Sequence, residues 1–352
     1  MLALAPIALV ALLALVVLVV DLFWPRRDDI VMALGVGGLV VALAATLSIG
    51  PLPWDYGALS EATSFGDPAL YTRDLLTALL DLALISIAIL TLLFAPDYLA
   101  PRKLPLAEFT ATLIFAVSGG MLIAGGQDLL ILFIGLELLV LPGYLLAGFA
   151  KRDGLSTEGA IKYFLLGSFS SAILLFGLAF VMGFTGSTQL GGVTEALQGV
   201  LSGEDALPLA LAMGLALLAV GALFKIAAVP FHYWTPDAYQ GSPTPVTGYL
   251  SVGPKIAAFA LILRIFVEAL GPMRGEWALI VGVLAAVTMT VGNLAALGQD
   301  NIKRMLAYSS IAHTGYMMVG LVVFATAEEP AVATAGVQGV LFYGVAYAFM
   351  NL

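Results

Sequence analysis

Long apolar segments recur along the whole chain, and they limit its fold more than any other feature of the sequence. Each is close to the ~20 residues that a helix needs to cross a hydrocarbon core of ~30 Å. About eleven such runs can be read directly: 1–20, 30–49, 75–95, 109–126, 129–150, 160–184, 207–232, 245–268, 277–297, 305–325 and 331–352. With 61% hydrophobic and 11% charged residues, the chain cannot build a soluble surface. We therefore expect an all-α polytopic membrane protein.

The composition also excludes several classes of function. The chain has no cysteine, which excludes disulfides, thiolate metal sites and cysteine-ligated iron–sulfur clusters. It shows no dinucleotide-binding fingerprint after a strand, no P-loop and no pair of haem ligands. We therefore expect no cofactor or metal in this chain, and no binding of nucleic acid.

Basic residues gather at alternate loops, a pattern that sets orientation in a membrane. The larger set comprises Arg26, Arg27, Arg102, Lys103, Lys151, Arg152, Lys162, Lys303 and Arg304. The opposite side has only Arg73, Arg264 and Arg274. The positive-inside rule places the larger set in the cytoplasm and the N-terminus outside. The first apolar run lacks a preceding basic segment, so we interpret it as an anchor and not as a cleavable signal peptide.

Three ionisable residues fall near the middle of apolar runs. Lys225 lies ~14 Å from Trp234 at helical rise, and Lys255 lies ~17 Å from Thr244. Glu137 is also near mid-depth. A charge at this depth costs at least ~2.5–3.5 kcal/mol on insertion scales. The three residues are therefore candidates for function.

Two interpretations of these residues remain open, a structural ion pair and a proton relay. Lysine suits a relay because burial favours the neutral amine and a nearby carboxylate favours the ammonium. Pro230 follows Lys225 by five residues and Pro254 directly precedes Lys255. Each proline removes a helical hydrogen bond. Broken membrane helices persist where the freed backbone meets protein or water, which favours the relay.

Both histidines have two open interpretations. His232 is either a proton-uptake group or an interfacial residue beside an aromatic belt. His313 is either a bridge along the relay or a helix-packing residue that is hydrogen-bonded to a hydroxyl. We interpret Asp81 and Lys162 as structural residues that can reach a membrane interface.

Several motifs resemble one known family. They are Phe224-Lys225, residues 230–237 (PFHYWTPD), 239–246 (YQGSPTPV), Pro254-Lys255, 135–138 (GLEL), 160–164 (AIKYF), Gly292-Asn293 and 303–313 (KRMLAYSSIAH). Over roughly residues 70–352 the chain resembles the antiporter-like, proton-pumping membrane subunits of respiratory complex I, and most of all subunit N of the bacterial NADH:quinone oxidoreductase.

The resemblance implies a fold of about fourteen helices, with inverted five-helix repeats that each contain a broken helix, the seventh here. It divides the chain into a three-helix segment (1–107), a first repeat (108–268) and an incomplete second repeat (275–352). The sequence stops inside the eleventh apolar run, so we expect a fragment that lacks about three helices.

The resemblance also implies roles. Glu137 would modulate the pump lysine Lys225, and Lys255 would link the half-channel to the central polar axis. The chain would be one subunit of a translocase in the bacterial inner membrane, without a redox centre of its own. FMN, iron–sulfur clusters, NADH and quinone would bind partner subunits. The membrane partners would be subunits M, L, K, J, A and H, next to a peripheral arm.

Two alternatives stay open. One is a subunit of a multi-subunit sodium/proton antiporter or of a membrane-bound hydrogenase. The other is a free-standing secondary transporter, which inverted repeats and broken helices also suit.

Overall fold

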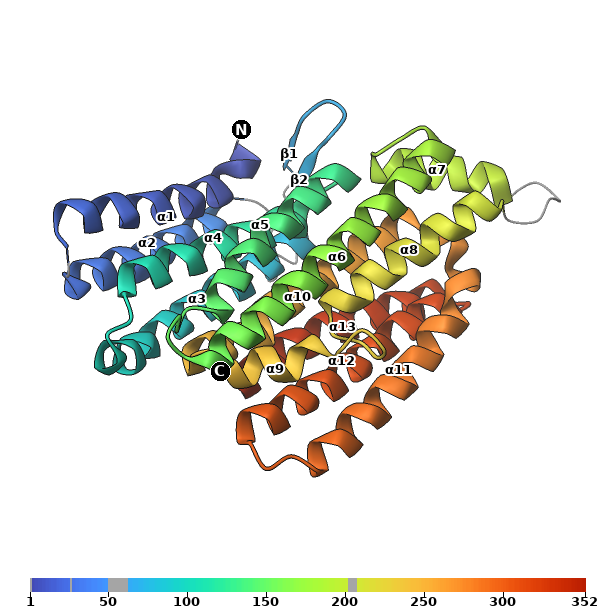
Figure 1. The fold of residues 1–352 in the computed structure, drawn as a ribbon. Coiled ribbons are helices and arrows are strands. Elements are labelled where there is room, and N and C mark those ends of the chain that lie inside the picture. The colour runs from blue at the N-terminus through green and yellow to red at the C-terminus, as the bar shows by residue number, and fades with distance from the viewer. Residues whose placement is uncertain (1, 26, 50–62, 202–207) are drawn as a thin grey trace. The chain divides into compact units, whose positions relative to one another are not determined.

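The computed structural model describes residues 2–25, 27–49, 63–201 and 208–352, so Arg26 lies outside the described residues. Within these ranges, ten helices are long and apolar enough to cross a membrane, and a shorter apolar helix spans Leu209–Lys225. Together they account for the apolar runs of the sequence, and the prediction of an all-α polytopic membrane protein is confirmed. Figure 1 shows the order of the helices along the chain.

The chain forms two compact units, and the first comprises Met1–Ile161, Gly241–Ala257 and Asn351–Leu352. Its complete elements are α1 (Ala5–Phe23), α2 (Asp28–Ser48), β1 (Thr63–Phe65), β2 (Tyr71–Arg73), α3 (Leu75–Leu99), α4 (Leu106–Gly125) and α5 (Leu129–Ala147). The helices α1 and α2 run side by side (Figure 1). Asp74 caps α3 by accepting a hydrogen bond from the Thr77 amide, and Asp128 caps α5 in the same way.

A small residue brings α4 and α5 into close contact. A methyl group at Gly119 would lie 2.6 Å from the Leu138 carbonyl carbon, so the two backbones pack with no side chain between them at this point. Close packing of this kind is typical of membrane helices, where small residues let backbones approach. The contact fixes the segment of α5 that carries Glu137.

The strands β1 and β2 form an antiparallel hairpin that the sequence did not predict. The hairpin places Arg73 in the interior of the first unit, where its side chain is fully buried. Its guanidinium pairs with Asp81 at 2.7 Å and donates to the carbonyl oxygens of Thr46 and Ile49, near the end of α2. Arg73, one of the smaller basic set, is therefore held inside the protein, and the side of the membrane on which it lies stays a prediction. Asp81 has the structural role expected of it, but it is fully buried and does not reach an interface.

The second unit comprises Lys162–Gln240 and Ala258–Met350. It contains most of α6 (Gly154–Thr185), the end of α10 (Thr244–Ile262) and the elements α7 (Leu190–Leu201), α8 (Leu209–Lys225), α9 (Trp234–Gly241), α11 (Arg274–Leu297), α12 (Ile302–Thr326) and α13 (Pro330–Asn351). Gly241 of α9, Asn351 of α13 and the remaining residues of α6 and α10 belong to the first unit.

Close packing also joins α11 to α12. A methyl group at Gly292 would lie 2.6 Å from the Ala312 nitrogen, and one at Gly315 would lie 2.8 Å from the Met289 nitrogen. Gly292 belongs to a motif that the sequence analysis singled out. Because neither glycine has room for a side chain, the pair sets the register of α12 and the position of His313.

A π-helical segment, Leu263–Ala269, extends α10. It buries Arg264, which pairs with Glu268 one turn later. The Thr194 hydroxyl of α7 donates to the carbonyl oxygens of Glu268 and Ala269, which anchors this amphipathic helix to the segment. Arg264, near the end of the apolar run 245–268, is thus a second buried arginine of the smaller basic set.

Candidate functional site

The seventh apolar run is broken at the lysine that the sequence singled out. The helix α8 ends at Lys225, and α9 begins only at Trp234. Ala227, inside the gap, adopts a left-handed conformation with φ of 58°, which no α-helix can accommodate. The predicted departure from helical geometry between Lys225 and Pro230 is confirmed. By contrast, α10 continues through Pro254 to Ile262, so only one of the two prolines lies at a helix break.

Side chains satisfy the backbone groups that the break sets free. Thr314 of α12 donates its hydroxyl to the Ile226 carbonyl at 2.8 Å. Thr288 of α11 accepts from the Val229 amide at 3.0 Å. The Trp234 indole donates to the Phe224 carbonyl at 3.3 Å. The freed backbone therefore contacts protein, one of the two environments in which irregular backbone persists in a membrane.

Lys225 is buried at the end of α8, with 8% of its surface exposed. Its ammonium donates to the Ser171 hydroxyl at 2.8 Å and to the Gly167 carbonyl at 3.3 Å, both on α6. Sequence reasoning missed these two partners, although the polar stretch 167–171 interrupts an apolar run. Because the contacts to α6 are neutral hydrogen bonds, they can hold either protonation state of the lysine.

His232 lies inside the break and is buried, with 7% of its surface exposed. Its ring stacks on Tyr233 at 4.5 Å between centroids, and Trp234 stacks on Tyr163 at 4.2 Å. Among the described residues, its Nδ1 atom has no hydrogen-bond partner. An unpaired imidazole nitrogen at a broken helix is available for a proton. Its role as a proton-uptake group or an interfacial residue stays a prediction.

Two site residues belong to the first unit. Lys255 lies on α10 with 3% of its surface exposed. Glu137 is half-buried on α5, and within the described ranges its Oε1 atom is buried and has no hydrogen-bond partner. A buried carboxylate oxygen without a partner is costly, which favours a functional reason for it. Lys225 belongs to the second unit, so the pairing of Glu137 with Lys225 stays a prediction.

His313 lies on α12 within a group of tyrosine rings. Its Nδ1 atom shares a hydrogen bond of 2.6 Å with the Tyr343 hydroxyl of α13. Its ring also packs against Tyr316 and Tyr347, at centroid distances of 5.5 and 4.9 Å. A hydroxyl can donate to or accept from imidazole, so this contact suits both the packing role and the relay role. The choice between them stays open.

An ionic network on α9 was not predicted as part of the site. Asp237 accepts from Lys162 of α6 at 2.6 Å and from Arg304 of α12, which also donates to Gln240. Burial opposes ionisation, but the hydrogen bonds from Lys162 and Arg304 hold the pKa of Asp237 below its ordinary value. Asp237 was visible in the sequence within the motif at 230–237. The network ties the short helix after the break to two long helices, and it explains Lys162 as a structural residue.

We expect Asp237→Asn to lower the thermal unfolding temperature at neutral pH, because it removes the carboxylate that pairs with both Lys162 and Arg304. The folded-state pKa is depressed, so the stabilisation by Asp237 is present above its ordinary pKa of 3.8 and is lost as pH falls through the lower folded value. The difference between wild type and variant should therefore shrink in acid. Thermal scans of both proteins from neutral to acidic pH measure it, and a difference that grows in acid would contradict the assignment.

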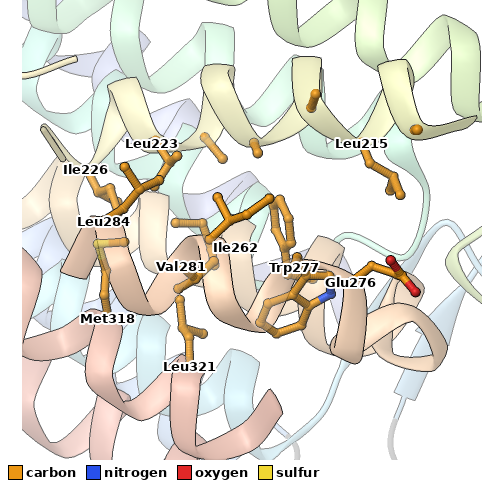
Figure 2. Close-up of a pocket in the computed structure, with 16 residues that line it drawn as sticks. Leu215, Leu223, Ile226, Ile262, Glu276, Trp277, Val281, Leu284, Met318 and Leu321 are labelled. Atoms are coloured by element: carbon orange, nitrogen blue, oxygen red, sulfur yellow. The ribbon is translucent and has the colours of Figure 1, made fainter. Parts of the chain in front are cut away.

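An apolar cavity of about 260 Å³ lies beside the break, between α8, the end of α10, α11 and α12. Figure 2 shows Leu223 and Ile226 at one end and the Glu276 carboxylate at the other. Its walls are otherwise apolar side chains, and such cavities do not hold ordered water.

A helix broken at a buried lysine, inside a bundle of membrane helices, is typical of ion-translocating membrane proteins. The chain belongs to the transmembrane family described as NADH:quinone oxidoreductase/Mrp antiporter, which matches residues 126–352. This result confirms the resemblance that the motifs indicated.

Several curated relatives carry the name of subunit N. The NADH-quinone oxidoreductase subunit N 2 of Symbiobacterium thermophilum is 41% identical over 99% of this chain and 69% of its own length. The subunit N 1 of Koribacter versatilis is 49% identical over 70% of this chain and 47% of its own. The chain thus spans between about half and two thirds of the length of these relatives.

Solved structures share the fold. A chain of respiratory complex I from Thermus thermophilus with bound aureothin is 34% identical, with a TM-score of 0.73 over 98% of this chain and 70% of that one. A chain of the Mrp complex from a Dietzia species has a TM-score of 0.79 over 99% of this chain and 63% of its own, at 23% identity. This second likeness concerns the fold alone.

Proposed function

We propose that the chain is part of the proton-translocating subunit N of an NADH:quinone oxidoreductase. In this proposal Glu137, Lys225 and Lys255 form a buried relay that takes up and releases protons. His232 and His313 are further candidates along the path. The observation that carries the proposal is the placement of Lys225, buried at the end of a broken helix and held by neutral partners on α6.

Burial of the lysine explains how its charge can be switched. The neutral amine is favoured by low polarity, and the ammonium by a nearby carboxylate, so a change in that carboxylate moves a proton on or off. Ser171 and Gly167 keep the nitrogen in place during the change because both accept a hydrogen bond from either form. The network around Asp237 holds the helix that follows the break.

In this complex the redox chemistry would take place in other chains. NADH, FMN, iron–sulfur clusters and quinone would bind partner subunits, and the energy of quinone reduction would reach this chain through membrane subunits M, L, K, J, A and H. The chain would lie in the bacterial inner membrane with its N-terminus outside. It is an enzyme only as a subunit of this translocase.

Deletion of the gene and complementation test the proposal. Membrane vesicles from the deletion strain should lose proton uptake driven by NADH, and the full-length wild-type gene should restore it. If uptake persists while sodium/proton exchange is lost, the chain belongs to an antiporter complex instead. Solute uptake by the chain alone would support a free-standing transporter.

We expect Glu137→Gln to depress NADH-driven proton uptake several-fold in the assembled complex. Glutamine keeps the shape of the side chain but removes the negative charge that stabilises a protonated lysine. Glu137→Asp keeps the charge and should be milder. Glu108→Gln, on α4, is the matched control and should retain uptake. Equal rates for Glu137→Gln and wild type would remove Glu137 from the relay.

A further inference from the structure

A second cavity, of about 670 Å³, lies in the first unit between the α3–α4 loop and the α5–α6 loop. Four basic residues line it: Arg102, Lys103, Lys151 and Arg152. The two carboxylates in its lining are Glu108 and Asp153. The cavity therefore carries an excess of positive charge, and none of the relay residues contributes to it.

The cations of this cavity are exposed, and the described residues offer them no ion pair. The Asp153 carboxylate caps α6 by accepting from the Leu155 amide, and Glu108 lies in the first turn of α4. Both acids thus lie at helix N-termini, whose partial positive charge they offset.

The cavity lies where membrane helices end. The third span ends at Arg102, α4 begins at Leu106, α5 ends at Ala147 and α6 begins at Gly154. These positions correspond to the headgroup level of a bilayer. Tyr98 supports the location because its ring holds the Arg102 guanidinium at 3.7 Å from the centroid, an amphipathic pair typical of the interface.

The remaining walls are apolar. Leu104, Phe149 and Pro243 line the cavity beside the basic residues. A soluble anion would use only the charged part of such a cavity. A phospholipid would use both parts, because its phosphate faces the cations and its glycerol and upper acyl chains face the apolar wall.

We propose that this cavity binds the phosphodiester headgroup of an anionic phospholipid. Basic pockets between membrane helices bind anionic headgroups through this chemistry, with about 1 kcal/mol for each basic residue near the surface, which corresponds to about fivefold in affinity. The site is independent of proton transfer, and it would anchor the loop before α4 and the loop before α6 to the membrane surface.

Photo-crosslinking in the assembled full-length complex tests the proposal. The probe is phosphatidylglycerol with a photoreactive headgroup, in vesicles of phosphatidylcholine, and labelled peptides are mapped by mass spectrometry. We expect labels on residues 98–108 and 149–153. Unlabelled phosphatidylglycerol should compete for them, whereas phosphatidylcholine and inorganic phosphate should not.

Variants that remove positive or negative charge from the cavity should have opposite effects on labelling. Changing Arg102, Lys103, Lys151 and Arg152 together to glutamine should reduce labelling at least about tenfold, and Glu108→Gln should increase it. Lys303→Gln is the control for a basic residue outside the cavity and should leave labelling unchanged. Equal competition by phosphatidylcholine, full competition by inorganic phosphate, or crosslinks to a partner subunit in place of these peptides would overturn the proposal.

Discussion

Lys225→Ala should reduce NADH-driven proton uptake by at least about tenfold in the assembled full-length complex, since positioned proton-transfer groups contribute about 100-fold or more to rate. Alanine removes the nitrogen that must alternately hold and release a proton. Because Lys225 is buried at the end of α8, a water molecule cannot easily take the place of its nitrogen. Membrane vesicles energised with NADH measure uptake and quinone reduction together, and native gels verify assembly.

Lys225→Arg separates a titrating lysine from a fixed charge. Arginine keeps a positive charge but does not release its proton at any working pH, so uptake should fall here as well. Ser171→Ala is the matched control, because it removes only the hydrogen bond of 2.8 Å and leaves the amine in place. It should be milder than either change at Lys225. If Lys225→Arg assembles normally and pumps at the wild-type rate, the lysine is a structural charge and the relay is wrong.

The sequence was sufficient to predict the helices and the break. Apolar runs of about twenty residues determine membrane helices by length alone. A proline five residues after a buried lysine indicated where the seventh run would fail, and the structure ends α8 at Lys225. The threonines that satisfy the freed backbone, Thr288 and Thr314, could not be assigned because they come from helices about sixty and ninety residues away.

The positions of buried arginines could not be predicted by the same reasoning. Arg73 precedes the apolar run 75–95 and Arg264 lies near the end of the run 245–268, and the orientation rule counts each only by the side of the membrane on which it lies. The hairpin of β1 and β2 and the π-helical segment turn their side chains inward. Nearby carboxylates, Asp81 and Glu268, compensate them, and a pattern of charge along the sequence does not reveal such pairs.

Arg73→Ala should destabilise the first unit by about 3–5 kcal/mol, which is the usual cost of removing one partner from a buried ion pair. Asp81 would be left with no exposed surface and without its counter-ion. The carbonyl oxygens of Thr46 and Ile49 would also lose their donor. Asp81→Ala should destabilise the unit by a similar amount, because it leaves the Arg73 guanidinium buried without its carboxylate partner. Unfolding midpoints of the purified full-length protein in detergent measure both.

The double variant Arg73→Met with Asp81→Leu decides between a charge effect and a packing effect. Replacing a buried pair by apolar residues of similar volume is often neutral or stabilising, because two desolvated charges disappear together. The double variant should therefore be more stable than either single variant. It should be less stable than wild type, because the hydrogen bonds from Arg73 to the end of α2 are lost. Arg27→Ala is the control, since its pair with Asp29 is exposed and should not measurably affect stability. If the double variant is as unstable as the sum of the singles, Arg73 acts through packing and its carbonyl contacts, and the ion pair contributes little.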